Sequence, residues 1–208
     1  MAISAKQVKD LRDITGAGFM DCKNALADTD GDLDKAVQLL REKGIAKAAK
    51  RVGRQASEGL IHSYIHGAGK LGVLVEVNCE TDFVAKTDEF KEFVNNVALQ
   101  ICSSDPISIS TDDVPGEVVA SELEIFKAQA AKTGKPENIC EKIAQGKMKK
   151  FYSESCLLEQ PYVKDPDKTI EEYLKEVIGK LGENIVITRF SRFVLGETTT
   201  ATQESSEE

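Results

Sequence analysis

The chain has 208 residues, of which 41% are hydrophobic and 30% are charged, and its formal net charge at pH 7 is −8. This hydrophobic content supports one compact domain with a small companion, or two small domains. The acidic balance argues against a dominant surface for nucleic acid or anionic membrane, because phosphate groups are bound by an excess of Lys and Arg. It favours a protein partner with basic patches.

The cysteines indicate neither a metal site nor a disulfide framework. Their number is odd and their long separations match no zinc or redox motif; they are Cys22, Cys79, Cys102, Cys140 and Cys156. We interpret them as reduced thiols. No apolar run approaches the roughly 18 residues that span a bilayer, and the first residues contain no signal core. The expected location is the cytoplasm, or an organelle after removal of a preceding segment.

Residues 4–44 are predicted to form three short helices. Ser4 and Gln7 make a capping box at the start, residues 16–18 separate the first two helices, and Gly44 is expected to end the third. The apolar stripes are Val8, Leu11 and Ile14, then Phe19, Cys22 and Leu26 with Met20 beside them, and then Leu33, Ala36, Val37 and Leu40. Three helices of this length predict a small bundle.

Residues 45–56 are rich in Ala and contain four basic residues without an acidic one. They are predicted to form a helical connector. One interpretation of this charge run is a solvated linker helix, and the other is a patch that contacts RNA or an acidic partner.

A β-hairpin is predicted over residues 57–79, with strands at 60–66 and 71–79 and a Gly-Ala-Gly turn between them. The next stretch, 80–86, contains neither Gly nor Pro. Thr81 is predicted to cap a short helical turn there, which places Phe83 and Val84 at a strand-to-helix corner. An apolar pair at such a corner either packs inward or contacts a partner, and the local sequence leaves both possibilities open.

The rest of the chain predicts an α+β core. Its expected elements are a helix capped by Thr87 and running to residue 102, a loop at 103–116, helices at 117–132 and 136–158, a turn at 160–166, a helix capped by Thr169, and a strand at 184–195. A sheet of about three antiparallel strands has edges that are usually covered or paired with another chain, and Arg189 and Arg192 can blunt one of them. The predicted domains are a bundle at 1–44, the connector at 45–56, the α+β core at 57–196, and a disordered acidic tail at 197–208.

Motifs for catalysis, metals and cofactors fail in detail. Asp28, Asp30 and Asp32 lack the spacing of a calcium loop, and His62 and His66 have no obvious third ligand. The chain contains no phosphate-binding glycine loop and no nucleophile elbow. A thiol nucleophile paired with a histidine is possible in principle, but sequence does not bring such residues together. We therefore expect no metal, no cofactor and no enzymatic activity.

Three motifs carry a resemblance to a known family. Residues 81–86 read Thr-Asp-Phe-Val-Ala-Lys and follow Glu-Val-Asn-Cys-Glu at 76–80. Residues 15–18 read Thr-Gly-Ala-Gly, with Leu-Arg shortly before them and Met-Asp-Cys-Lys shortly after, and residues 160–164 read Gln-Pro-Tyr-Val-Lys. In these segments the chain resembles bacterial elongation factor Ts, the family of nucleotide exchange factors for elongation factor Tu, in its short form.

The resemblance implies a ubiquitin-associated-like N-terminal bundle followed by a dimerisation core. It also implies a guanine nucleotide exchange factor that binds the GDP form of elongation factor Tu, displaces magnesium and releases GDP. Asp82 and Phe83 would act on the GTPase domain, with Thr81 and Val84 flanking them. Phe19 and Met20 would dock the bundle on the same domain, although the family commonly has Met where Phe19 stands.

Short members of the family can complete one core from two chains, so the resemblance implies a homodimer that binds two GTPases with two-fold symmetry. No direct contact with nucleic acid or membrane is expected. The alternative function is a ubiquitin-associated-like interaction module that binds a peptide or RNA without exchange activity. The basic connector slightly favours this alternative, whereas the net acidity does not.

Overall fold

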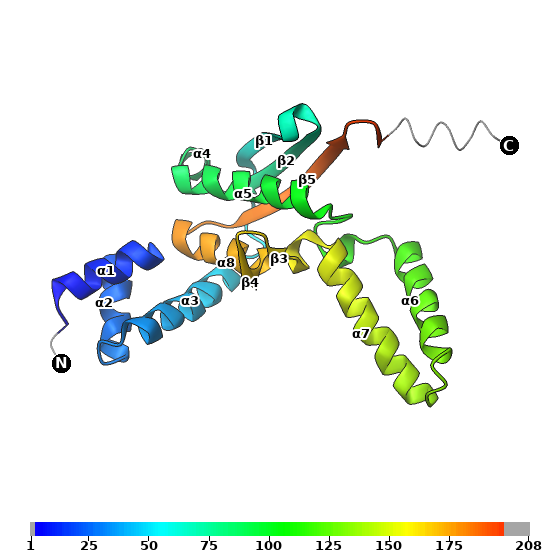
Figure 1. The fold of residues 1–208 in the computed structure, drawn as a ribbon. Coiled ribbons are helices and arrows are strands. Elements are labelled where there is room, and N and C mark those ends of the chain that lie inside the picture. The colour runs from blue at the N-terminus through cyan, green and yellow to red at the C-terminus, as the bar shows by residue number, and fades with distance from the viewer. Residues whose placement is uncertain (1–2, 198–208) are drawn as a thin grey trace. The chain divides into compact units, whose positions relative to one another are not determined.

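A computed structural model of the chain describes residues 3–197 and has an α+β fold (Figure 1). The helices are α1 (Ala5–Thr15), α2 (Phe19–Asp28), α3 (Leu33–Ala49), α4 (Asp82–Ala85), α5 (Asp88–Ser104), α6 (Gly116–Ala131), α7 (Glu137–Ser155) and α8 (Ile170–Leu181), with 3-10 turns η1 (Gly67–Gly69), η2 (Thr111–Asp113) and η3 (Leu157–Glu159). The strands are β1 (Glu58–His66), β2 (Leu71–Cys79), β3 (Pro161–Tyr162), β4 (Asp165–Thr169) and β5 (Ile185–Val194).

The three N-terminal helices form a bundle with its own core, as predicted. Ser4 and Gln7 make the expected capping box, and the Asp32 side chain caps α3. The core contains Val8, Leu11, Cys22, Ala25, Leu26, Ala36 and Leu40. Ile14 and Phe19, which the stripes placed in this core, are instead exposed. They occupy the last turn of α1 and the first residue of α2, where the bundle has no further helix turn to cover them.

The predicted end of the third helix at Gly44 is wrong. Helix α3 continues through Gly44 to Ala49, so the first part of the predicted connector belongs to this helix and residues 50–54 form a turn. Gly44 has a packing role instead, because a Cβ atom added to Gly179 would lie 3.0 Å from the Gly44 Cα. Two glycines therefore allow α3 and α8 to approach closely.

The main sheet has the strand order β1-β2-β5, so the last strand returns to the hairpin as predicted. Along β2, Val73, Val75, Val77 and Cys79 are buried while Leu74 is exposed, which confirms the predicted alternation. The predicted stripe of α5 is fully buried: Phe90, Phe93, Val94, Val97 and Ile101. Arg189 and Arg192 pair with Glu76 and Asp105.

Two predictions for residues 136–166 need correction. Helix α7 ends at Ser155 because Cys156 is extended and forms a bridge with Ser108. The predicted turn at 160–166 is a two-stranded sheet, β3 with β4. Its support is distant in sequence, since the buried Gln100 side chain accepts a hydrogen bond from the Val163 N–H (2.8 Å).

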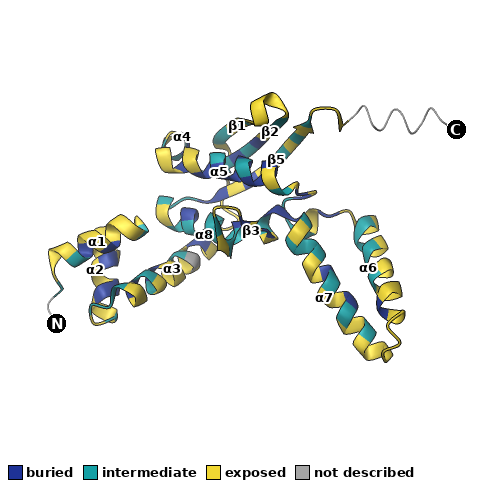
Figure 2. Cartoon of the chain, in the orientation of Figure 1, coloured by how far each residue is buried: buried dark blue, intermediate teal, exposed yellow. Residues whose placement is uncertain are grey.

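The described chain divides into two compact units. The first contains residues 3–59, 78–91 and 172–186, and the second contains residues 60–77, 92–171 and 187–197. In the second unit, α6 and α7 form a helical hairpin whose residues are largely exposed (Figure 2). None of the helices within residues 3–197 combines the length and apolar character needed to cross a bilayer. Of the predicted tail at 197–208, all but the first residue lies outside the described part.

Candidate functional site

The candidate site is the α4 turn, which we define as Thr81 together with α4 (Asp82–Ala85). The Thr81 hydroxyl accepts a hydrogen bond from the Val84 N–H (3.4 Å), and the Thr81 carbonyl accepts one from the Ala85 N–H (3.3 Å). These bonds satisfy backbone donors that the start of a helix leaves without an intrahelical partner. The predicted cap is confirmed.

The α4 turn buries Ala85 and exposes Phe83. Ala85 has a relative exposure of 5%, whereas Phe83 is 79% exposed. Residues two apart on an α-helix lie about 200° apart around its axis, so burial of one directs the other to solvent. Asp82 and Val84 are half-buried beside it. Of the two orientations that the sequence left open, inward packing is therefore wrong for Phe83.

Thr87 joins the α4 turn to α5. Its hydroxyl donates a hydrogen bond to the Val84 carbonyl (2.8 Å) and accepts one from the Phe90 N–H (3.2 Å). Because Phe90 is completely buried, this side of the turn is attached to the core. The predicted capping role of Thr87 is confirmed.

Asp82 forms an ion pair with Lys86 one turn later, with 2.5 Å between the carboxylate oxygen and Nζ. The hydrogen bond from Lys86 lowers the pKa of Asp82 below its ordinary value, and the same bond raises the pKa of Lys86. Both side chains are open to solvent. The site therefore presents an ionised carboxylate directly beside an exposed aromatic ring.

The loop between α8 and β5 holds the other side of the turn. The Glu183 carboxylate accepts hydrogen bonds from the Thr81 N–H (2.9 Å) and from the Thr81 hydroxyl (2.6 Å). In return, the Glu80 carboxylate accepts one from the Asn184 N–H (2.6 Å). Sequence reasoning missed this loop because the partners are 102 and 104 positions apart, and no local pattern marks such pairs.

The second predicted contact lies at the corner between α1 and α2. Phe19 and Met20 begin α2 and are 51% and 60% exposed, and Ile14 is exposed at the end of α1. We call these three residues the α2 corner. The corner and the α4 turn belong to the same compact unit, the first one.

Side chains that could hold a metal ion do not gather in the described part of the chain. Within residues 3–197, no three His, Cys, Asp or Glu side chains form a group suited to a metal ion. All five cysteines are free. Burial raises the pKa of Cys79 to about 11 and also raises the pKa of Cys102 and Cys156. Protonated thiols of this kind are poor nucleophiles.

Comparison with known proteins identifies the family. The model of the family described as elongation factor TS matches residues 2–197. The elongation factor Ts of Desulfosudis oleivorans is 60% identical over 195 residues, which cover 94% of this chain and 98% of that protein. The elongation factor Ts of Caldanaerobacter subterraneus subsp. tengcongensis is 58% identical over 195 residues with the same coverage. That of Coprothermobacter proteolyticus is 60% identical over 197 residues, covering 95% of this chain and all of that protein. The chain belongs to the elongation factor Ts family.

Proposed function

We propose that this chain is a guanine nucleotide exchange factor for elongation factor Tu. It binds the GDP form, displaces magnesium and releases GDP, so that GTP can bind during translation elongation. It changes binding affinities and catalyses no chemical step. The observation that carries the proposal is Phe83, a large apolar side chain 79% exposed on a capped turn, at the position where the family resemblance places a wedge.

In this proposal the α4 turn enters the GTPase domain near the magnesium and phosphate site. Phe83 inserts its ring, and Asp82 brings a negative charge close to the groups that support the metal. The hydrogen bond from Lys86 lowers the pKa of Asp82. Thr81 and Val84 flank the inserted ring and hold the turn in shape through the cap.

The free energy gained by burying its ring limits the effect that Phe83 alone can have on nucleotide affinity. Exchange requires factor and nucleotide to weaken each other's binding by the same factor. Burial of one Phe side chain contributes about 1.5–3 kcal/mol, which corresponds to about one or two powers of ten in affinity. A larger effect requires further contacts. The α2 corner, with Phe19 and Met20, supplies a second contact with the GTPase domain from the same compact unit.

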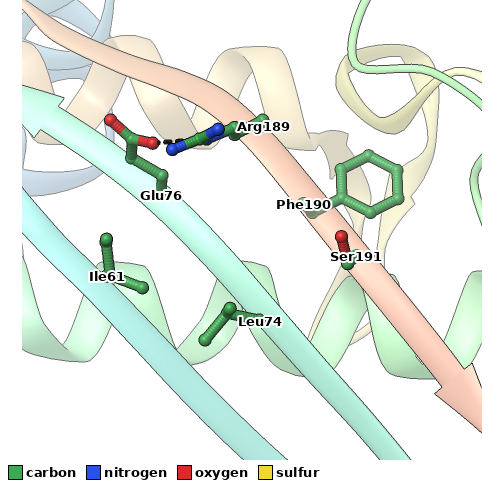
Figure 3. Close-up of a pocket in the computed structure, with 6 residues that line it drawn as sticks. All are labelled: Ile61, Leu74, Glu76, Arg189, Phe190 and Ser191. Carbon is green, nitrogen blue, oxygen red and sulfur yellow. Dashed lines mark hydrogen bonds and ion pairs between the residues drawn. The ribbon is translucent and has the colours of Figure 1, made fainter.

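We also propose that the chain is a homodimer that binds two GTPases. The support is a set of exposed apolar residues on the strands of the main sheet and directly after β5, which we call the exposed sheet face. Its residues are between 46% and 76% exposed and comprise Ile61, Ile65, Leu74, Phe193 and Leu195. Ile61 and Leu74 lie on neighbouring strands and line a pocket there (Figure 3). All five residues belong to the second unit.

A second copy of the same face is a suitable cover for this surface. Exposed apolar patches of this kind mark interaction sites, and a two-fold axis presents the same patch from both chains. Arg189 and Glu76 also line the pocket and form an ion pair at 2.7 Å (Figure 3), so each charge has a partner of opposite sign. In the proposed dimer, the apolar residues around the pocket would therefore lie beside an ion pair and not beside an unpaired charge.

The basic connector gives the alternative function little support. Lys47 pairs with Asp21 at 2.9 Å, and Arg54 lies 3.7 Å from Glu80. Part of the positive charge that RNA would require is therefore neutralised within the chain. We propose a cytoplasmic factor that contacts neither nucleic acid nor membrane directly.

Release of fluorescent GDP from elongation factor Tu tests the main proposal. The full chain should accelerate release, and raised magnesium should oppose the acceleration, because metal and factor compete. A chain that binds elongation factor Tu without accelerating release would overturn the exchange function and favour the interaction module.

A further inference from the structure

We propose that Glu183 is a positioning residue for exchange, which sets the shape of the α4 turn and thereby the presentation of Phe83. The inference rests on the proposed exchange function and adds a residue outside the segment 81–84. Glu183 lies in the loop between α8 and β5, and it reaches the turn through Thr81.

Glu183 contacts Thr81 through two hydrogen bonds. One carboxylate oxygen of Glu183 accepts the Thr81 N–H at 2.9 Å, and the other accepts the Thr81 hydroxyl at 2.6 Å. Both bonds are partly buried, and a charged acceptor makes each stronger than a neutral one. Two bonds to one residue restrain its backbone and its χ1 angle together.

This restraint determines how the cap works. The Thr81 hydroxyl gives its proton to Glu183, so its lone pairs face the Val84 N–H, from which it accepts at 3.4 Å. The Thr81 carbonyl accepts from the Cys79 thiol at 3.1 Å and from the Ala85 N–H at 3.3 Å. Every polar atom of Thr81 is therefore bonded, and Glu183 takes both of its donors.

The loop and the turn also hold each other reciprocally. Glu183 binds the backbone of Thr81, and Glu80 binds the backbone of Asn184 at 2.6 Å. The Asn184 side chain donates to the Arg54 carbonyl at 2.8 Å. Residues 80–81 therefore cannot shift without disturbing residues 183–184.

Helix α8, which precedes this loop, also touches the bundle that carries the α2 corner. Gly179 meets Gly44 closely, and a Cβ atom on Gly16 would lie 2.5 Å from the Lys180 side chain. Arg41 of α3 lies 3.1 Å from Glu176. Within the first unit, α8 and its loop connect the two proposed contact surfaces, so loss of the Glu183 contact weakens the attachment of the turn to the bundle.

The experiment measures stimulated GDP release by the full chain and by four variants: Glu183→Gln, Phe83→Ala, the double variant of both, and Glu154→Gln. Gln at 183 retains one acceptor oxygen, but its NH2 group is a donor and offers no acceptor for the Thr81 hydroxyl proton. Glu154→Gln is the control, because it makes the same chemical change in an exposed ion pair on α7, where Glu154 pairs with Lys150.

We expect Glu183→Gln to reduce maximal release about tenfold, which corresponds to about 1.4 kcal/mol, because one of the two hydrogen bonds from Thr81 to a charged acceptor is lost. In the Phe83→Ala background the same change should cost less than about twofold, because it acts through the ring that is already absent. The concentration for half-maximal release should change little, and Glu154→Gln should behave as the parent chain.

Two results would overturn the inference. One is normal release by folded Glu183→Gln, and the other is an equal loss in the presence and absence of Phe83, which indicates a general structural role. If Glu183→Gln fails to fold, Thr81→Val and Thr81→Ser replace it: Ser should retain release and Val should lose it, and equal activity of the two rejects the inference. Failure of the parent chain to accelerate release rejects the exchange function itself and is a separate outcome.

Discussion

Two of the surfaces at which the chain exposes apolar side chains differ in form. The α4 turn presents a single ring, Phe83, beside charged residues and on a turn that Thr81 caps. The exposed sheet face presents five apolar residues on neighbouring strands and the strand end after β5. A single projecting ring suits insertion into a partner's pocket, whereas a broad face needs another broad face. The two surfaces therefore indicate different partners.

The largest expected effect concerns the sheet face. Leu74→Glu removes a Leu that the proposed interface would bury and places a charge there, and the two-fold axis applies both changes twice. With about 1.5–3 kcal/mol per Leu, the dimer dissociation constant should rise at least about 100-fold. Sedimentation velocity at micromolar concentration measures this change.

The control for the sheet face is Ile107→Glu, which alters an exposed residue outside the sheet. This variant should sediment as the parent chain does. A Leu74→Glu chain that remains dimeric would show that another surface carries self-association, and the contrast between the two apolar surfaces would lose its meaning.

Substitution of one phenylalanine on each surface tests whether the two surfaces bind different partners. Phe83→Ala should lower stimulated GDP release about 10- to 100-fold with little effect on the melting temperature, because the ring is exposed. Phe193→Ala, the same change on the sheet face, should weaken dimerisation and leave release by the assembled dimer near the parent rate. Reversed or equal effects of the two variants would contradict the assignment of partners.

A smaller effect is expected at the α2 corner. Phe19 is already half-covered, so Phe19→Ala removes about 1 kcal/mol of burial and should raise the concentration for half-maximal release about fivefold. Met20→Leu conserves volume and should leave this concentration unchanged. Insensitivity to Phe19→Ala would remove the α2 corner from the contact with the GTPase.

The smallest effect concerns the charge beside Phe83. Lys86 lowers the folded-state pKa of Asp82. The ion pair therefore stabilises the fold at pH values above the unfolded-state pKa of Asp82, about 4. This stabilisation disappears as the pH falls through the folded-state pKa. Lys86→Gln should return the pKa of Asp82 toward its ordinary value in an NMR titration. Lys150→Gln, which breaks the exposed pair with Glu154, should leave the Asp82 titration as it is.

Several predictions that depend on neighbouring residues were confirmed. The capping roles of Ser4, Thr81 and Thr87 and the alternation along β2 follow from hydrogen bonds and side-chain directions within a few residues. The failures share another cause. Gly44 is tolerated inside α3 because α8 packs against it, and β3 and β4 form where a turn was predicted, next to a buried Gln100.

The sequence by itself determined the α+β class, the N-terminal bundle, the hairpin and the capped turn, because periodicity and capping act over one or two helix turns. The domain boundaries and the roles of Thr81, Asp82, Phe83, Val84, Phe19 and Met20 in partner binding remain predictions. Only the tertiary structure decided that Phe83 faces solvent, and that Glu183 holds the turn from 102 positions away. Both depend on which segments contact each other in the folded chain, and a pattern of neighbouring residues does not predict such contacts.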